Sequence, residues 1–295
     1  GIYRISANER KKVMLYFDHA ATTKVEPEVL QEMQPFLLHL YGNPSSVYTF
    51  GTDAKEMMER ARAQIAKTIG AKKEEIFFTA GGTESDNWAL VGTAEGLREK
   101  GRHIITSEIE HHGILETCAY LEKRGYDVTY LPVEEDGIIS VEKLEGAIRK
   151  DTILISIMAA NNEVGSIQPI KEIGKMAKEK GVLFHTDAVQ AYLHEEIDVE
   201  EMGIDMLSAS GHKFGSPKGV GFLYVREGID LPAFLHGGGQ EKKKRAGTEN
   251  VAGIIGMGKA SAIAGKKRKE NHEKLLRMRN YLIERLLREI PECRV

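Results

Sequence analysis

The stretch Ile153-Leu154-Ile155-Ser156-Ile157-Met158 decides the fold, because it is apolar and shows no alternation of apolar and polar residues. A strand that is covered on one face alternates, whereas a strand that is covered by helices on both faces reads as a nearly continuous apolar run. The stretch therefore predicts a central strand of a mostly parallel sheet.

Short β-branched runs alternate with longer amphipathic stretches along the rest of the chain, which is typical of βα units. We expect seven strands, at residues 75–79, 103–107, 127–131, 153–158, 182–186, 206–209 and 220–225. We expect helices at residues 55–69, 169–180 and 275–290. The apolar stripe of the third helix needs a partner surface, either another domain or a second subunit. These patterns predict an α/β fold with a mostly parallel seven-stranded sheet flanked by helices.

Composition excludes several classes of protein. The chain has 295 residues, of which 41% are hydrophobic and 29% charged, and these are values of an ordinary globular protein. The formal net charge of -3 gives no reason to expect nucleic acid or an anionic membrane as partner. Cys118 and Cys293 stand in no metal-ligand spacing, and Cys118 lies at helical spacing from Ile114 and Leu121, as a core residue does. We expect no metal site, and a cytoplasmic location.

The first segment that can carry chemistry is Thr79-Ala80-Gly81-Gly82-Thr83, which joins an expected strand to an expected helix. Backbone N–H groups and the positive end of a helix dipole converge at such a junction, where a phosphate can bind. The same two glycines can also form a plain turn. The segment is neither a Walker loop nor a dinucleotide fingerprint.

Two further segments follow expected strands. Asp187 stands at the carboxyl end of a buried strand, the place where open α/β sheets bind ligands. It can keep a pyridine nitrogen protonated, or it can be an ordinary N-cap. Lys213 lies between a Ser-Gly-His turn and a Phe-Gly-Ser-Pro turn, a rigid and poorly solvated place for an amine, whereas Lys218 fits a solvated turn lysine. Ser210 and His212 can add phosphate donors beside it.

The fourth segment, Glu110-His111-His112-Gly113, follows the expected strand 103–107. Adjacent histidines point in different directions, which argues against a two-histidine metal site. A more specific interpretation is that one of these imidazoles lies over an aromatic ligand. The alternative is a histidine with a purely structural role.

These four segments, in this order, resemble the NifS/IscS-like cysteine desulfurases of the class V aminotransferase family, which bind pyridoxal 5'-phosphate on fold type I. The resemblance extends over nearly the whole chain. It also includes residues 16–23, 42–46, 160–165, 237–241 and 245–250.

The resemblance implies a role for each matching residue. Lys213 is similar to the Schiff-base lysine, Asp187 to the partner of the pyridinium nitrogen, and His111 to the histidine that stacks on the ring. Gln190 would bond the ring hydroxyl oxygen, and Asn162 would lie near that oxygen and the substrate carboxylate. The implied phosphate ligands are Gly82, Thr83, Ser210 and His212, together with Thr248, which would reach the site of the partner subunit in a homodimer.

Some positions depart from the family pattern. His19 stands where the family has asparagine, and residues 214–217 replace a more usual turn. The family's loop with the nucleophilic cysteine, and its arginine for the substrate carboxylate, would lie beyond residue 295. We expect an N-terminal segment at residues 1–20 that packs with a small domain, a cofactor-binding domain at residues 21–255, and a helical region at residues 256–295 that leads into an incomplete small domain.

The resemblance implies removal of sulfur from L-cysteine, to give alanine and an enzyme persulfide for iron–sulfur cluster biogenesis or thiolation, with a scaffold or sulfur-acceptor protein as partner. We expect this chain to bind the cofactor without normal turnover unless the missing cysteine loop is supplied. The alternatives are another class V aminotransferase or a selenocysteine lyase, and a non-catalytic scaffold for sulfur transfer.

Overall fold

A computed structural model describes residues 15–295, and part of the expected N-terminal segment, residues 1–14, lies outside the described residues. The α-helices are α1 (Pro27–Leu38), α2 (Thr49–Thr68), α3 (Gly82–Gly96), α4 (His112–Glu122), α5 (Val141–Ala147), α6 (Ile170–Lys180) and α7 (Val251–Glu289). The strands are β1 (Ile76–Thr79), β2 (His103–Ser107), β3 (Asp127–Leu131), β4 (Thr152–Ser156), β5 (Leu183–Asp187), β6 (Met206–Ser210) and β7 (Gly221–Val225). Short 3-10 helices are η1 (Lys73–Glu75), η2 (Gly211–Lys213) and η3 (Gln240–Lys243).

The seven strands form one sheet in the order β1-β7-β6-β5-β4-β2-β3, so the expected α/β class and strand number are confirmed. Strands β2 to β6 pair in parallel, whereas β7 runs antiparallel to both β1 and β6. Strand β4 has a neighbour on each side and is buried at every position, as its unbroken apolar run predicts.

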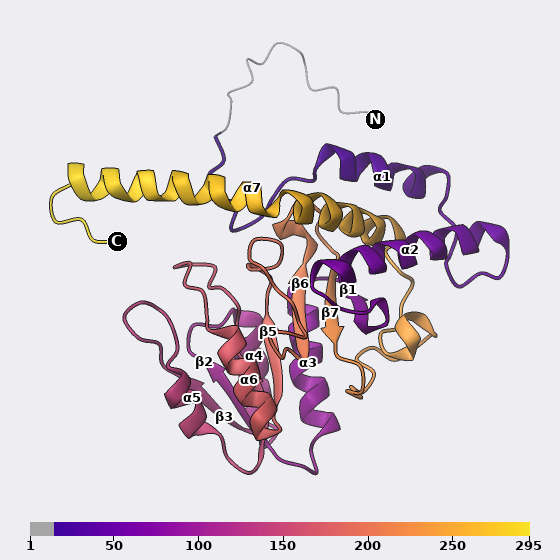
Figure 1. Ribbon diagram of the computed structural model, residues 1–295. Coiled ribbons are helices and arrows are strands. Elements are labelled where there is room, and N and C mark those ends of the chain that lie inside the picture. The colour runs from indigo at the N-terminus through magenta and orange to yellow at the C-terminus, as the bar shows by residue number, and fades with distance from the viewer. Residues whose placement is uncertain (1–14) are drawn as a thin grey trace.

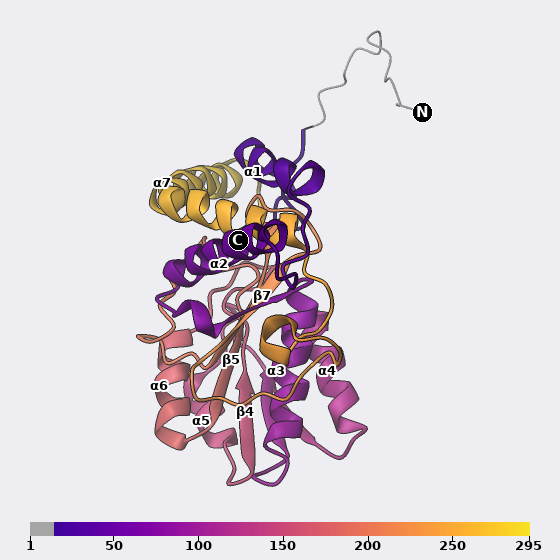
Figure 2. The ribbon, with the colours of Figure 1, turned by 90° about the vertical axis from the view of Figure 1, so that its right-hand side faces the viewer.

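Helices cover both faces of the sheet (Figures 1 and 2). Successive strand residues face opposite cores, since strand side chains alternate in direction. Ile104 belongs to the core under α3 and α4, and its neighbour Ile105 belongs to the core that includes α1, α2, α6 and α7. Cys118 is fully buried in the first of these cores, as its spacing predicts. Within residues 15–295, no helix is both long enough and apolar enough to cross a membrane.

The helix expected at residues 275–290 is the second half of α7, which is 39 residues long. Glycines interrupt the apolar pattern of its first half and lower its intrinsic helix propensity, so the sequence pattern does not predict a helix there. Tertiary packing overrides that propensity. A Cβ at Gly256 would lie 2.6 Å from the Met33 sulfur, and a Cβ at Gly258 would lie 2.5 Å from that of Ala61. The glycines let α7 approach α1 and α2 closely.

The second half of α7 extends away from the sheet (Figure 1). Its apolar side chains Leu275, Met278 and Leu282 are exposed in this chain. The expected stripe therefore exists, and nothing within residues 15–295 covers it.

Candidate active site

A cavity of about 280 Å³ opens where the parallel strands end. Asp187 ends β5 and Ser210 ends β6, and these two strands pair in parallel. The carboxyl ends of such strands form the ligand crevice of an open α/β sheet. Nine of the ten site residues expected from the sequence line this cavity: Gly82, Thr83, His111, Asn162, Asp187, Gln190, Ser210, His212 and Lys213.

Lys213 lies on η2, which follows β6 directly. Its side chain is only partly exposed, and burial lowers the pKa of its amine, although Asp187 and Asp18 act in the opposite direction. The Nζ atom donates to the backbone carbonyl oxygens of Ala20 and Ala21. Lys218, by contrast, is exposed. The amine at position 213 is thus held inside the cavity, and its depressed pKa favours the neutral form that a nucleophilic lysine needs.

Asp187 is buried, and it combines the two interpretations that the sequence left open. Its Oδ1 accepts a hydrogen bond from the backbone N–H of Val189 at 2.8 Å, which is a local turn of the capping type. The side chain also lines the cavity, where Oδ2 can accept from a ligand. Burial raises the pKa of this carboxyl, and His111 and Lys213 oppose that effect. A cationic ring nitrogen beside Asp187 would favour its charged form.

The phosphate-binding groups expected from the sequence surround the N-terminus of α3. Gly82 opens this helix, and a Cβ there would lie 2.6 Å from the Cγ2 of Val189, so a larger residue would require Val189 to move. Gly82, Thr83, Ser210 and His212 also line an adjoining cavity of about 610 Å³. The first N–H groups of a helix have no acceptor within the helix, and they favour an anion.

His111 is exposed and lines the cavity, while its Nδ1 accepts a hydrogen bond from the backbone N–H of Gly113 at 3.0 Å. This bond leaves Nε2 as the protonated nitrogen of the neutral ring. Gln190 donates from Nε2 to the carbonyl of Ala20 at 2.9 Å, the carbonyl that also accepts from Lys213. Asn162 lines the cavity and bonds the side chain of Glu163.

Asp86 is a cavity residue that the sequence analysis missed. It is 1% exposed, and one ligand atom each from Asp86, His111 and Asp187 lie within 4.8 Å of one another. Burial, and then the charge of Asp187, raise the pKa of the Asp86 carboxyl well above its ordinary value. A signal was present, because Asp86 is three residues after Thr83 and therefore shares its face of α3.

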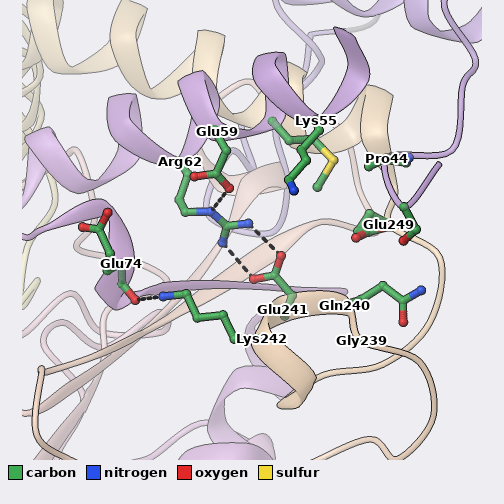
Figure 3. Close-up of a pocket in the computed structure, with 12 residues that line it drawn as sticks. Pro44, Lys55, Glu59, Arg62, Glu74, Gly239, Gln240, Glu241, Lys242 and Glu249 are labelled. Atoms are coloured by element: carbon green, nitrogen blue, oxygen red, sulfur yellow. Dashed lines mark hydrogen bonds and ion pairs between the residues drawn. The ribbon is translucent and has the colours of Figure 1, made fainter. Parts of the chain in front are cut away.

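Thr248 lies outside the cavity of its own chain, on an exposed loop after η3. A buried ion pair anchors this loop, as Figure 3 shows. Arg62 on α2 makes two bonds of 2.8 Å to the buried carboxylate of Glu241, which also accepts from the backbone N–H of Phe78 at 2.9 Å. Glu241 and the next two residues have positive φ angles of 44°, 57° and 66°, a conformation that costs non-glycine residues free energy. The buried ion pair holds this strained turn in place.

A second ion pair ties the same loop to the N-terminal end of α3. Arg245 donates from Nε to the carboxylate of Glu84 at 2.7 Å, and from a terminal nitrogen at 3.1 Å. Glu84 also accepts from the backbone N–H of Ala80 at 3.0 Å. Two ion pairs, at Glu241 and Arg245, therefore fix the chain that leads into Thr248 against α2 and α3.

The cavity fits pyridoxal 5'-phosphate group by group. Among the lining groups, the amine of Lys213 could hold the aldehyde, the carboxyl of Asp187 a ring nitrogen, the amide of Gln190 a ring hydroxyl, and the N-terminus of α3 the phosphate. A mostly parallel sheet with this cavity at the carboxyl ends of its parallel strands defines a pyridoxal-phosphate-dependent enzyme of fold type I.

The comparisons with known proteins agree with that class. The model of the aminotransferase class-V family matches residues 15–295. The chain belongs to this family, whose members depend on pyridoxal 5'-phosphate.

Individual relatives are similar over most of this chain. It is 55% identical over 286 residues to a cysteine desulfurase IscS of Methanosarcina thermophila. The matched stretch covers 97% of this chain and 70% of the relative. Among solved structures, a NifS-like protein has a TM-score of 0.91 at 43% identity and covers 93% of this chain and 76% of that one. The structure of SspA in complex with cysteine has a TM-score of 0.82 at 46% identity and covers 84% of this chain and 72% of that one.

Proposed function

We propose that this chain is the cofactor-binding part of a cysteine desulfurase, which removes sulfur from L-cysteine to give alanine. The observation that carries the proposal is the shared cavity of Lys213, Asp187 and the Gly82 end of α3. The cysteine desulfurase relative and the cysteine complex of SspA support the choice of substrate. We further propose a homodimer, transfer of sulfur to an iron–sulfur scaffold or another acceptor protein, and a cytoplasmic location.

The residues of this chain divide the chemistry among them. When bound, pyridoxal 5'-phosphate supplies an aldehyde for the amine and a ring that withdraws electrons from the substrate α-carbon. Asp187 would hold the ring nitrogen in its protonated form, and His111 would lie against the ring. The Lys213 amine would take the α-proton at Nζ, and burial, which lowers its pKa, favours this role as a general base. Asn162 orients the substrate carboxylate.

The sulfur acceptor must be a reactive thiolate, and Cys118 cannot supply it. This thiol is fully buried in α4, and burial raises its pKa to about 12. Cys293 follows α7 and does not line the cavity. We therefore propose that sulfur transfer needs a thiol other than these two.

A product assay tests the substrate and separates the rivals. With pyridoxal 5'-phosphate and L-cysteine, we expect alanine to form slowly, and to form faster when dithiothreitol is added as a thiol acceptor. Alanine and sulfide would be measured side by side. Alanine from selenocysteine alone would favour a selenocysteine lyase, and amino transfer to a keto acid would favour an aminotransferase. Wild-type protein that takes up no cofactor would favour the non-catalytic scaffold and contradict the proposal.

Thr248 allows a test of the homodimer. We expect Thr248→Glu to weaken cofactor binding by roughly tenfold or more, since a carboxylate would face the phosphate of the partner site. A mixture with Lys213→Ala chains should restore one normal site per mixed dimer, because that site combines Lys213 of one chain with Thr248 of the other. Cofactor bound per dimer would be measured. No recovery in the mixture would mean that Thr248 acts within its own chain or not at all.

We also propose the domain division expected from the sequence, with residues 21–255 as the cofactor-binding domain and residues 256–295 leading into a small domain. The exposed apolar stripe on the second half of α7 supports a surface that another part of the protein covers.

A further inference from the structure

Glu110 is a buried carboxyl group beside the cavity that the proposed mechanism does not use. It is 5% exposed and lies on the loop between β2 and α4, next to His111. Its Oε1 accepts a hydrogen bond from the Ser107 hydroxyl at 2.6 Å. The backbone N–H of Met158 donates to both of its oxygens, at 3.0 and 3.1 Å. One side chain thus joins the ends of two neighbouring strands.

The sheet explains why a carboxyl group is needed there. Strands β2 and β4 pair in parallel up to Thr106 and Ser156, and then the chain after β2 turns away. Beyond this point, the N–H groups of Ile157 and Ala159 bond to β5, so the N–H of Met158 points to the side that β2 has left. A buried N–H without an acceptor is costly, and Glu110 supplies the acceptor that the missing strand would have given.

Both ends of this contact reach the cofactor cavity. Met158 lines the cavity itself, and so does His111, the residue that follows Glu110. A second bond secures the same loop, since the buried Asn161 donates to the carbonyl of Ile109 at 2.9 Å. The backbone on both sides of Glu110 is therefore held by hydrogen bonds.

We propose that Glu110 is a positioning residue, which extends the β2–β4 ladder by its side chain and so holds His111 and Met158 against the cofactor ring. The inference rests on the proposed function only where it concerns the cofactor. Burial raises the pKa of Glu110 to about 8, and the bonds from Ser107 and Met158 oppose this. A neutral acid at pH 7 resembles glutamine in shape, so Glu110→Gln should keep the bonds through its remaining oxygen.

Glu75 offers a matched control. It is also a buried glutamate that accepts two backbone N–H groups, those of Lys72 and Glu227, each at 2.8 Å. It precedes β1 and therefore lies at the opposite end of that strand from Gly82. Glu75→Ala and Glu110→Ala remove the same kind of group, but only the second lies next to the cavity.

The experiment compares Glu110→Ala, Glu110→Gln and Glu75→Ala with the wild type. The imidazole signals of His111 would be followed by NMR in protein without cofactor, and the dissociation constant of pyridoxal 5'-phosphate by equilibrium dialysis. We expect both alanine variants to melt at lower temperature. We expect only Glu110→Ala to shift the His111 signals and to weaken cofactor binding about tenfold, which corresponds to about 1.4 kcal/mol, and we expect Glu110→Gln to behave like the wild type.

Two results would overturn the inference. One is a set of His111 signals that stays at its wild-type position in Glu110→Ala. The other is an equal loss of cofactor affinity in Glu75→Ala, which would reduce Glu110 to general support of the fold. A wild-type protein that binds no pyridoxal 5'-phosphate would instead contradict the proposed function, and the His111 signals would still decide the role of Glu110.

Discussion

Lys213→Ala is expected to abolish covalent attachment of pyridoxal 5'-phosphate and to lower alanine formation by roughly 10²–10⁴-fold, the range for loss of a general base. The expectation follows from the position of the amine, which lies in the same cavity as Asp187 and has a pKa lowered by burial. Borohydride reduction followed by intact mass measurement would detect the attached cofactor in the wild type and its loss in the variant.

Lys218→Ala is the matched control for this substitution. The residue is also a lysine of the segment after β6, but it is exposed and does not line the Asp187 cavity. We expect the reduced wild type and the reduced Lys218→Ala protein to carry one cofactor each. Attachment at Lys218, or attachment that survives in Lys213→Ala, would mean that the wrong amine has been assigned.

Arg62→Met is expected to have the largest effect on stability. It would leave the carboxylate of Glu241 buried without its cation, and the loss of one partner from a buried pair costs about 3–5 kcal/mol in the free energy of unfolding. Urea denaturation would measure it. The adjacent strained turn should loosen as well, so proteolysis within residues 239–250 is expected to become faster.

Two further variants sharpen this second prediction. In Arg62→Met/Glu241→Gln the uncompensated charge is gone, while the amide oxygen can still accept from Phe78, so we expect most of the stability to return. Arg285 forms an exposed pair with Glu289 on α7, and Arg285→Met should leave the unfolding midpoint unchanged. A single Arg62→Met variant as stable as the wild type would show that the loop is held by other contacts.

The strands and their number could be predicted because each is a short β-branched run between longer amphipathic stretches, and burial of β4 on both faces adds an unbroken apolar run. The antiparallel direction of β7 left no such mark, since a short buried strand reads the same in either direction. The first half of α7 was missed for a related reason. Its glycines are unfavourable in an isolated helix, and only the close packing against Met33 and Ala61 makes them useful.

The candidate site also contains residues that the sequence indicates and residues that only the fold brings together. Asp187 is the last residue of β5 and Lys213 follows β6 within three residues, so the sequence indicates at which edge of the sheet they lie. Their roles remain predictions, although nine of the ten residues share a cavity. Asp86 was missed although its spacing from Thr83 indicates its face of α3, and the contact that Glu110 makes could not be predicted from the sequence. The need for Glu110 arises from the unmatched N–H of Met158, 48 residues away, and only the arrangement of β2 and β4 brings the two together.

Helix α7 has a mechanical consequence. Its 39 residues make a rod about 58 Å long at 1.5 Å per residue, and proline, the usual source of a kink, is absent from it. The first half of α7 packs against α1 and α2, and this packing sets the direction of the exposed second half, the free half. A domain that packs on the free half would therefore have a fixed orientation relative to the crevice that contains Lys213. Any tilt of that domain would strain the contacts of α7 with α1 and α2.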